Sequence, residues 1–195
     1  ILQAPMYDIN ASYEENLGAI GYVIAPRINA SGRLGCASRS VEMFLTDDKD
    51  KAYELANDLC KENTIRQQTE QQMFKEALDY IEAHPEMKDD RVLVIPHENW
   101  HHGIVGIVSS KITEKFYKPS ILFAIDGEEA KGSGRSISGY NLFEALESST
   151  DLLVKFGGHE LAAGLSIKSD KIDEFRERIN SYVPEKISKE CMIPT

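Results

Sequence analysis

A run of 38 residues without glycine or proline, from Asp47 to His84, constrains the fold of this chain more than any other feature. Thr46, Asp47 and Asp48 supply side chains that can cap a helix at its start, and Pro85 would end it. The run therefore predicts a single helix. At the usual rise per residue such a helix is about 57 Å long.

The middle of this predicted helix, residues 61–72, is almost wholly polar. Apolar residues gather instead toward its two ends: Ala52, Leu55, Ala56 and Leu59, then Met73, Phe74, Ala77, Leu78 and Ile81. A helix that is polar all round bridges two packed units through solvent. A coiled coil is less favoured, because no heptad repeat continues through the middle. We therefore predict a linking helix over residues 46–85.

The residues before this helix are too few to fold alone. A short apolar stretch over 18–26 ends in proline, residues 27–33 form a predicted loop, and residues 37–45 a short helix. The chain starts at Ile1 without a methionine, so we expect it to be part of a longer protein. Residues 1–45 are interpreted as the end of a domain that lies mostly upstream.

The residues after the linking helix predict one compact α/β domain over 86–183, followed by a polar tail over 184–195. Apolar runs predict strands at 91–96, 120–125, 130–137 and 163–167, and amphipathic spacing predicts helices at 104–116, 141–147 and 169–182. Strands that alternate with helices predict a mixed or largely parallel sheet flanked by helices.

Composition limits the classes of partner and compartment. The net charge is −10, and −7 of it falls within residues 46–90, which hold 13 acidic and 6 basic residues. A polyanion would therefore contact a few placed cations, not a broad basic face. No apolar run approaches the length needed to span a membrane, and no signal peptide is visible. Three widely spaced cysteines fit a reducing, cytoplasmic setting.

A glycine-rich segment over residues 156–164 surrounds His159 with Gly157, Gly158 and Gly164. Such residues add little to a core, but they allow a sharp turn and the close approach of a ligand. A histidine there can donate a hydrogen bond to a phosphate oxygen. The alternative is an ordinary glycine turn with an exposed histidine.

A pair of histidines, His101 and His102, follows a predicted buried strand and precedes a helix. Ligands bind at the carboxyl ends of strands in open α/β sheets, and a helix N-terminus attracts anions. We expect the two rings to point apart, with one toward a ligand and the other structural. The alternative is a capping loop that contains a core tryptophan, Trp100.

Two further clusters carry cationic side chains. Strand alternation places Ser133 and Arg135 on one face of residues 131–136, where a hydroxyl beside a guanidinium suits a phosphate. The alternative is a plain hairpin. Arg27 and Asn29 lie in the predicted loop after Pro26, which is otherwise interpreted as an interdomain linker. No Asp and His cluster has metal-ligand spacing, so no metal site is predicted in this chain.

Four motifs in this order resemble the bacterial RecJ family of single-stranded-DNA-specific exonucleases, within the DHH phosphoesterase superfamily. They are Ala25-Pro-Arg-Ile-Asn-Ala-Ser-Gly-Arg-Leu34, Trp100-His-His-Gly-Ile-Val-Gly-Ile-Val108, Gly132-Ser-Gly-Arg-Ser136 and Phe156-Gly-Gly-His-Glu-Leu-Ala-Ala-Gly164. The last motif is shared across the superfamily, whereas the first is more particular to the RecJ family. The resemblance covers nearly the whole chain.

The resemblance implies a division of labour. In the family an N-terminal DHH domain binds two Mn²⁺ or Mg²⁺ ions, and a linking helix leads to a DHH-associated domain that holds substrate phosphates. This chain lacks the Asp-His-His motif, so the resemblance implies a substrate-binding part that is inactive alone. Residues 1–45 would then be the end of the DHH domain.

By the same resemblance, single-stranded DNA is the partner, cleaved from the 5′ end during repair and recombination. Its phosphates would bind Arg27, Asn29, His101, Ser133 and Arg135, beside the glycines at 157 and 158. The histidine at 159 would act in catalysis at the scissile phosphate. Alternatives are an oligoribonuclease or cyclic-dinucleotide phosphodiesterase of the superfamily, or a non-catalytic binding module for nucleic acid or protein.

Overall fold

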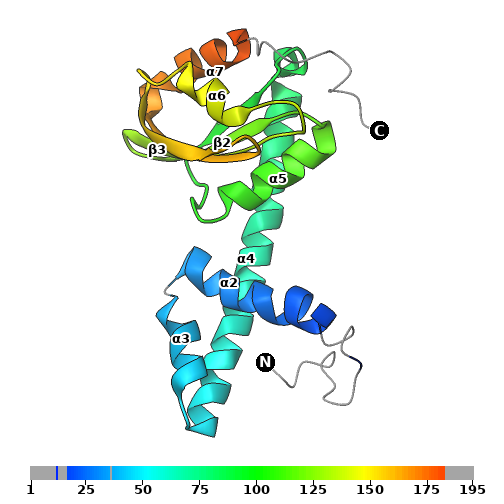
Figure 1. The fold of residues 1–195 in the computed structure, drawn as a ribbon, viewed down its shortest axis with the longest axis vertical. Helices are drawn as coiled ribbons and strands as arrows, with labels where there is room; N and C mark the ends of the chain where they lie inside the picture. The colour runs from blue at the N-terminus through cyan, green and yellow to red at the C-terminus, as the bar shows by residue number, and fades with distance from the viewer. Residues whose placement is uncertain (1–11, 13–16, 36, 183–195) are drawn as a thin grey trace. The chain divides into compact units, whose positions relative to one another are not determined.

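The computed structural model describes residue 12, residues 17–35 and residues 37–182 (Figure 1). The predicted tail over 184–195 lies outside the described residues, as does much of the segment before residue 17. The chain divides into two compact units, residues 1–69 and 70–195. Within the described residues, no helix is long and apolar enough to cross a bilayer.

In the described part of the first unit residues 27–33 are helical, which corrects the loop that was predicted there. A π-helix, η1 (Ile20–Ile24), runs directly into α2 (Ala25–Leu34). Pro26 is the second residue of α2 and follows the wider turn of η1, so the helical segment continues through a residue that has no N–H to donate. The sequence prediction was wrong because it took Pro26 as the end of a segment, although a helix with a π-turn can accommodate proline.

The predicted helix after α2 is confirmed as α3 (Ser38–Leu45). The two helices meet through the buried hydroxyls of Ser31 and Ser40, whose oxygens lie 2.7 Å apart. Gly35 closes α2, because its N–H donates to the carbonyl of Ser31 at 3.0 Å.

The long helix is confirmed as α4 (Lys49–Ala83), which the boundary between the two units crosses at Thr69. The Asp48 carboxylate caps it by accepting from the N–H groups of Asp50 at 2.9 Å and Lys51 at 3.3 Å. The helix ends before Pro85, which opens a short 3₁₀ turn, η2 (Pro85–Lys88). Both termini therefore follow from the capping and proline signals in the sequence.

The second unit contains a five-stranded sheet in the order β1-β2-β3-β5-β4. Its strands are β1 (Leu93–His97), β2 (Ser120–Asp126), β3 (Glu129–Arg135), β4 (Leu153–His159) and β5 (Ala162–Lys168). Only β1 and β2 pair in parallel, and the other three pairings are antiparallel. The predicted mixed sheet is confirmed, whereas the largely parallel version is not, because short turns join β2 to β3 and β4 to β5 and make those pairs antiparallel.

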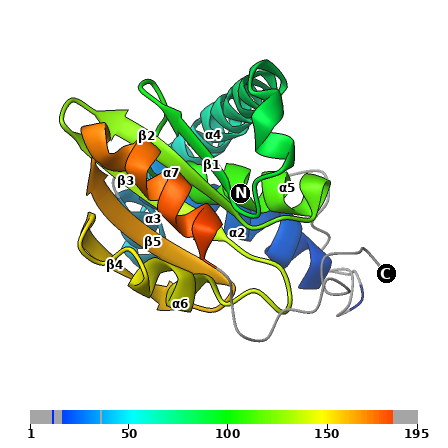
Figure 2. The same ribbon diagram turned by 90° about the horizontal axis from the view of Figure 1, so that it is seen from above.

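Helices cover both faces of the sheet (Figures 1 and 2). On one face α6 (Leu142–Glu147) and α7 (Ile172–Ser181) pack over a core that includes Phe123, Leu165 and Phe175. On the other face α5 (Val105–Phe116) packs against β2 and β3. α5 therefore covers β2 and β3 on the second face, and β5 and β4 extend beyond it.

The two C-terminal helices begin differently. Asn141 caps α6, because its side-chain oxygen accepts from the N–H groups of Phe143 and Glu144. Ser169 and Asp170 do not cap α7, because they lie in a 3₁₀ turn, η3 (Ser169–Lys171), that precedes it. The Ser169 hydroxyl instead donates to the carbonyl of Gly127 at 3.1 Å.

The Asn180 side chain of α7 hydrogen-bonds to the backbone just before β1, and its loss should destabilise the second unit. The Asn180 amide oxygen accepts from the N–H groups of Arg91 at 2.7 Å and Val92 at 2.9 Å, and its nitrogen donates to the Val92 carbonyl at 3.1 Å. Because Val92 is fully buried, these backbone groups have no water to replace the side chain. Asn180→Ala should lower the free energy of unfolding by about 2 kcal/mol, measured by urea denaturation.

The matched variant Asn180→Asp keeps an oxygen that can accept both hydrogen bonds but loses the donor to Val92. We expect it to lose less stability than Asn180→Ala. Equal stability of the wild type and Asn180→Ala would contradict this role for the side chain.

Candidate phosphate-binding face

Ser133 and Arg135 lie on one face of β3, as strand alternation predicted. The Arg135 guanidinium donates from Nη1 to the Ser133 hydroxyl at 3.1 Å and to the Gly134 carbonyl at 2.7 Å. Both side chains are half-buried. These bonds hold the guanidinium against its own strand, so its orientation is set before any ligand arrives.

The sheet register aligns this arginine with His159. Arg135 pairs with Ala162 on β5, and Ala162 pairs with His159 at the end of β4. Residues that pair directly across antiparallel strands point to the same face, so Arg135 and His159 share the face that α5 covers only in part. The sheet thus places a guanidinium and an imidazole two strands apart in a single row.

The next row of paired residues, beside that of Arg135 and His159, has almost no side chains and is called the glycine row. Ser133 pairs with Gly164, which pairs with Gly157. A Cβ built on either glycine would meet nothing within 4 Å, so open space lies above both. A cleft of about 380 Å³ lies there, lined in part by these two glycines. The backbone of the sheet is therefore accessible to a ligand at this point.

The glycine-rich segment is a strand and not the turn that the sequence suggested. Gly157, Gly158 and His159 belong to β4, and the chain reverses afterwards at Glu160 and Leu161. Gly158 differs from its neighbour, because its φ is +151° and an added Cβ would lie 2.3 Å from the Ala162 carbonyl oxygen. Gly157 faces the open cleft, whereas Gly158 permits the close pairing of β4 with β5.

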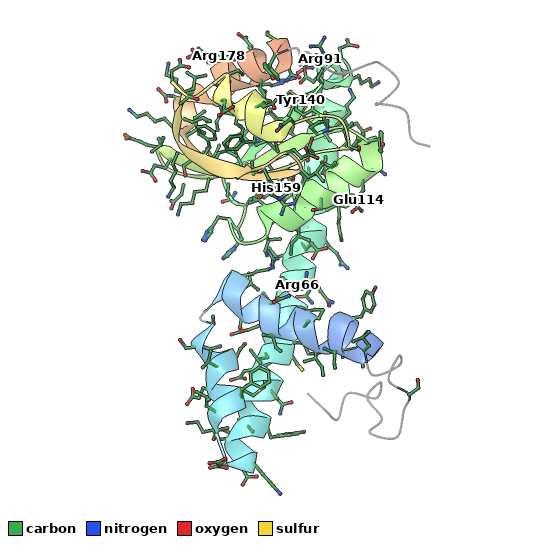
Figure 3. The ribbon with its side chains drawn as sticks, in the orientation of Figure 1. Arg66, Arg91, Glu114, Tyr140, His159 and Arg178 are labelled. Carbon is green, nitrogen blue, oxygen red and sulfur yellow. The ribbon has the colours of Figure 1, made fainter. Side chains whose placement is uncertain are left out.

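His159 is exposed at the end of β4 (Figure 3). Its Nδ1 accepts from the N–H of Leu161 at 3.3 Å. A ring nitrogen that accepts carries no proton, so in the neutral ring the proton is on Nε2. The side chain therefore offers an N–H donor whether or not it is charged.

His101 and His102 lie between β1 and α5, at the carboxyl end of β1 as predicted. The two rings stack, with centroids 5.0 Å apart and planes 15° apart, so the expectation that they point apart was wrong. A tight turn brings both rings to one side, since the His101 Nδ1 accepts from the N–H of Gly103 at 3.1 Å. Burial, followed by the charge of its neighbour, lowers the pKa of His101.

Both histidines line a second cleft of about 280 Å³, which also includes Asp126 and Lys131. Trp100 anchors this loop, because its indole N–H donates to the Glu76 carboxylate of α4 at 2.8 Å. Burial opposes ionisation of Glu76, but hydrogen bonds from Gln72 and Trp100 outweigh it and lower the pKa of that carboxyl. Trp100 is buried, as the alternative interpretation of this loop expected.

The sequence analysis did not single out Gly106, in the first turn of α5. A Cβ at this position would lie 2.9 Å from the Ser133 hydroxyl oxygen and 3.0 Å from Nη2 of Arg135. Glycine there lets α5 lie close against both side chains. A glycine inside a predicted helix is unfavourable unless something approaches it closely, and this signal could have identified it.

Arg27 and Asn29 lie on α2, in the first unit. The Arg27 Nε donates to the Cys60 sulfur at 3.3 Å, and its Nη1 donates to the Val23 carbonyl. Asn29 is exposed. The structure thus gathers Ser133, Arg135 and His159 on one face, while these two predicted residues belong to the other unit.

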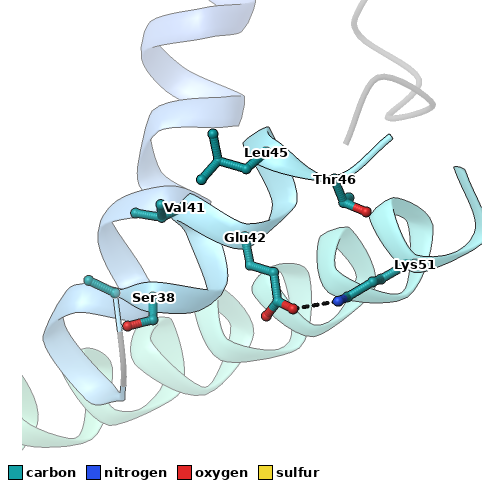
Figure 4. A pocket seen from close by; sticks show the side chains of 7 residues that line it. Ser38, Val41, Glu42, Leu45, Thr46 and Lys51 are labelled. Atoms are coloured by element: carbon teal, nitrogen blue, oxygen red, sulfur yellow. Dashed lines mark ion pairs between the residues drawn. The ribbon is translucent and has the colours of Figure 1, made fainter. Parts of the chain in front are cut away.

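A further pocket of about 610 Å³ lies in the first unit, between α3 and the start of α4 (Figure 4). Its walls are partly apolar, with Val41 and Leu45, and its one cation, Lys51, already pairs with Glu42 at 2.6 Å. This pairing leaves the pocket poorly suited to an anion. Within the described residues, no group of three or more His, Cys, Asp or Glu could hold a metal ion.

Comparisons with known proteins agree with these motifs. Residues 89–185 match the model of the DHHA1 domain family. The chain is 38% identical over 183 residues to the single-stranded-DNA-specific exonuclease RecJ of Bacillus subtilis, covering 93% of this chain and 23% of that protein. It is 42% identical over 173 residues to RecJ of Escherichia coli, covering 85% of this chain and 30% of that protein.

A solved structure of RecJ from Thermus thermophilus with Mn²⁺ is similar in fold. It superposes with a TM-score of 0.77 at 33% sequence identity, over 87% of this chain and 25% of that one. A structure of the same protein with Mg²⁺ gives a TM-score of 0.76 over 87% and 26% of the two chains, at 34% identity. The chain spans between a quarter and a third of the length of most of these relatives.

Proposed function

Since this chain belongs to the RecJ family and carries its DHHA1 domain, we propose that it is the substrate-binding part of a 5′→3′ single-stranded-DNA exonuclease. The observation that carries the proposal is that Ser133, Arg135 and His159 lie on one face of the sheet. Beside them, Gly157 and Gly164 leave the backbone of the sheet accessible. A guanidinium, a hydroxyl and an imidazole N–H are the donors that a phosphodiester accepts.

Arg135 and Ser133 bind a phosphate at the 5′ end of the strand in this proposal. The guanidinium is already oriented by the Ser133 hydroxyl, so little conformational freedom is lost when the phosphate binds. The open glycine row lets the sugar–phosphate backbone approach the sheet, where a side chain would hold it away.

His159 has a catalytic role in the proposal, as a donor to an oxygen of the scissile phosphate. Its Nδ1 is occupied by the Leu161 N–H, so Nε2–H is the group that can donate. Negative charge builds on the phosphoryl oxygens during hydrolysis, and a placed donor stabilises that charge. His101, Arg27 and Asn29 remain proposed phosphate ligands.

The described residues do not supply a ligand set for a catalytic metal. We assign metal binding to a part of the protein that the described residues do not include. The solved relatives contain Mn²⁺ or Mg²⁺, and such ions would activate water for hydrolysis. The contribution of this chain is then to hold the strand in place for that reaction.

A binding titration of the purified chain tests the proposal. The chain should bind a short single-stranded DNA at low salt without cleaving it when Mn²⁺ is added. The affinity should fall linearly with salt on logarithmic axes, since phosphate contacts release counterions. The same sequence as a duplex is the control and should bind more weakly. Lack of single-strand binding at low salt would contradict the proposal, and Mn²⁺-dependent cleavage would contradict the assignment of the metals.

A further inference from the structure

A second cationic row crosses the same face of the sheet. Lys131 on β3 pairs with Ser166 on β5, and Ser166 pairs with Lys155 on β4. Direct pairing turns all three side chains to one face, which is the face of Arg135 because Lys131 lies four residues before it on β3. The two lysines are exposed, and Ser166 between them is buried.

Three rows of paired residues thus cross β3, β5 and β4. The first cationic row contains Arg135 and His159, the glycine row contains Ser133, Gly164 and Gly157, and the second cationic row contains Lys131, Ser166 and Lys155. The glycine row lies between the two cationic rows. Alternate residues of a strand are about 6.6 Å apart, so the cationic rows are separated by about 13 Å. Flexible lysine side chains can reach across part of this distance toward the glycine row.

The cleft above the glycines joins the two rows. Lys131, Lys155 and Ser166 line it together with Gly157 and Gly164. No Cβ occupies the space over these two glycines, so a sugar or base can lie there while a phosphate is held on each side. The cleft volume of about 380 Å³ lies within the range of small-ligand sites.

Lys131 also lines the cleft of His101 and His102. It is therefore common to both clefts on this side of the sheet. The next row along the strands pairs Glu129 with Lys168, where opposite charges offset each other. The positive potential of this face thus declines beyond Lys131 and Lys155.

We infer that Lys131, Ser166 and Lys155 form a second phosphate subsite, which binds an internucleotide phosphate of the strand whose 5′ end lies at Arg135. The inference rests on the proposed function, since it assumes that the first row binds a phosphate of the same strand. Two ammonium groups and a hydroxyl hold the phosphate, and the glycine row accommodates the nucleoside between the two phosphates. The subsite makes affinity depend on strand length.

Binding of two nucleotides to the purified chain tests the subsite. Thymidine 5′-monophosphate offers one phosphate, and the dinucleotide pdTpdT offers two. Wild type should bind pdTpdT more tightly than the monophosphate. The double variant Lys131→Gln/Lys155→Gln should weaken pdTpdT binding by about fivefold to tenfold and leave the monophosphate unchanged. With longer single strands, the slope of log affinity against log salt should fall by about 0.7.

Lys171→Gln is the control for each single substitution, Lys131→Gln or Lys155→Gln, because each removes one positive charge. Lys171 lies on η3, next to α7 on the opposite face, and its ammonium pairs with Glu174 at 3.0 Å. Lys131→Arg should retain most of the affinity, because it keeps the charge. If the double variant and Lys171→Gln lose the same pdTpdT affinity, the second subsite is wrong and the first stands. If wild type binds neither nucleotide, the proposed function and the subsite fail together.

Discussion

Gly158→Ala should destabilise the second unit by about 3 kcal/mol or more. The φ of +151° is strained for any residue with a Cβ. The new methyl would also lie 2.3 Å from the Ala162 carbonyl oxygen and 2.6 Å from Cα of Ala163. Both are backbone atoms of the paired strand β5, so no side-chain rotation relieves the overlap. Urea denaturation followed by circular dichroism measures the loss.

Gly157→Ala is the control, one residue away on the same strand. A Cβ there meets nothing within 4 Å, and the φ of Gly157 is not in the left-handed region. We expect less than about 1 kcal/mol of destabilisation for this change, together with weaker binding to single-stranded DNA, because the methyl enters the cleft. Equal stability losses at the two glycines would contradict the distinction between them.

The sequence predicted the long helix and most of the sheet because their signals are local. The Asp48 cap and Pro85 bound α4, and continuous apolar runs mark β1 and β2. β4 was missed, because its glycines and mostly exposed side chains carry no apolar pattern. The order of the strands was not predictable either, since β5 lies between β3 and β4 through long-range pairing.

The candidate site was predictable in part. Alternation along β3 was enough to place Ser133 beside Arg135. The alignment of His159 with Arg135 depends on the register of three strands, which no local pattern encodes. The different environments of Gly157 and Gly158 are also invisible in the sequence, because both residues are glycine and only packing separates them.

Arg135→Ala should weaken binding to 5′-phosphorylated single-stranded DNA by about thirtyfold. A charge-assisted hydrogen bond contributes about 2 kcal/mol, which corresponds to that factor. The loss should be much smaller for the same strand with a 5′-hydroxyl, since the terminal phosphate is the proposed ligand. Fluorescence anisotropy with the two strands at one salt concentration measures both affinities.

Two variants separate geometry from charge in this result. Arg135→Lys keeps the charge but loses the planar fork, so its affinity for the phosphorylated strand should lie between those of wild type and Arg135→Ala. Arg178→Ala removes an arginine from α7, where the guanidinium pairs with Asp151 and Glu174, and it should leave binding unchanged. If Arg135→Ala weakens both strands equally, its guanidinium binds an internal phosphate or supports the sheet, and the terminal-phosphate role is rejected.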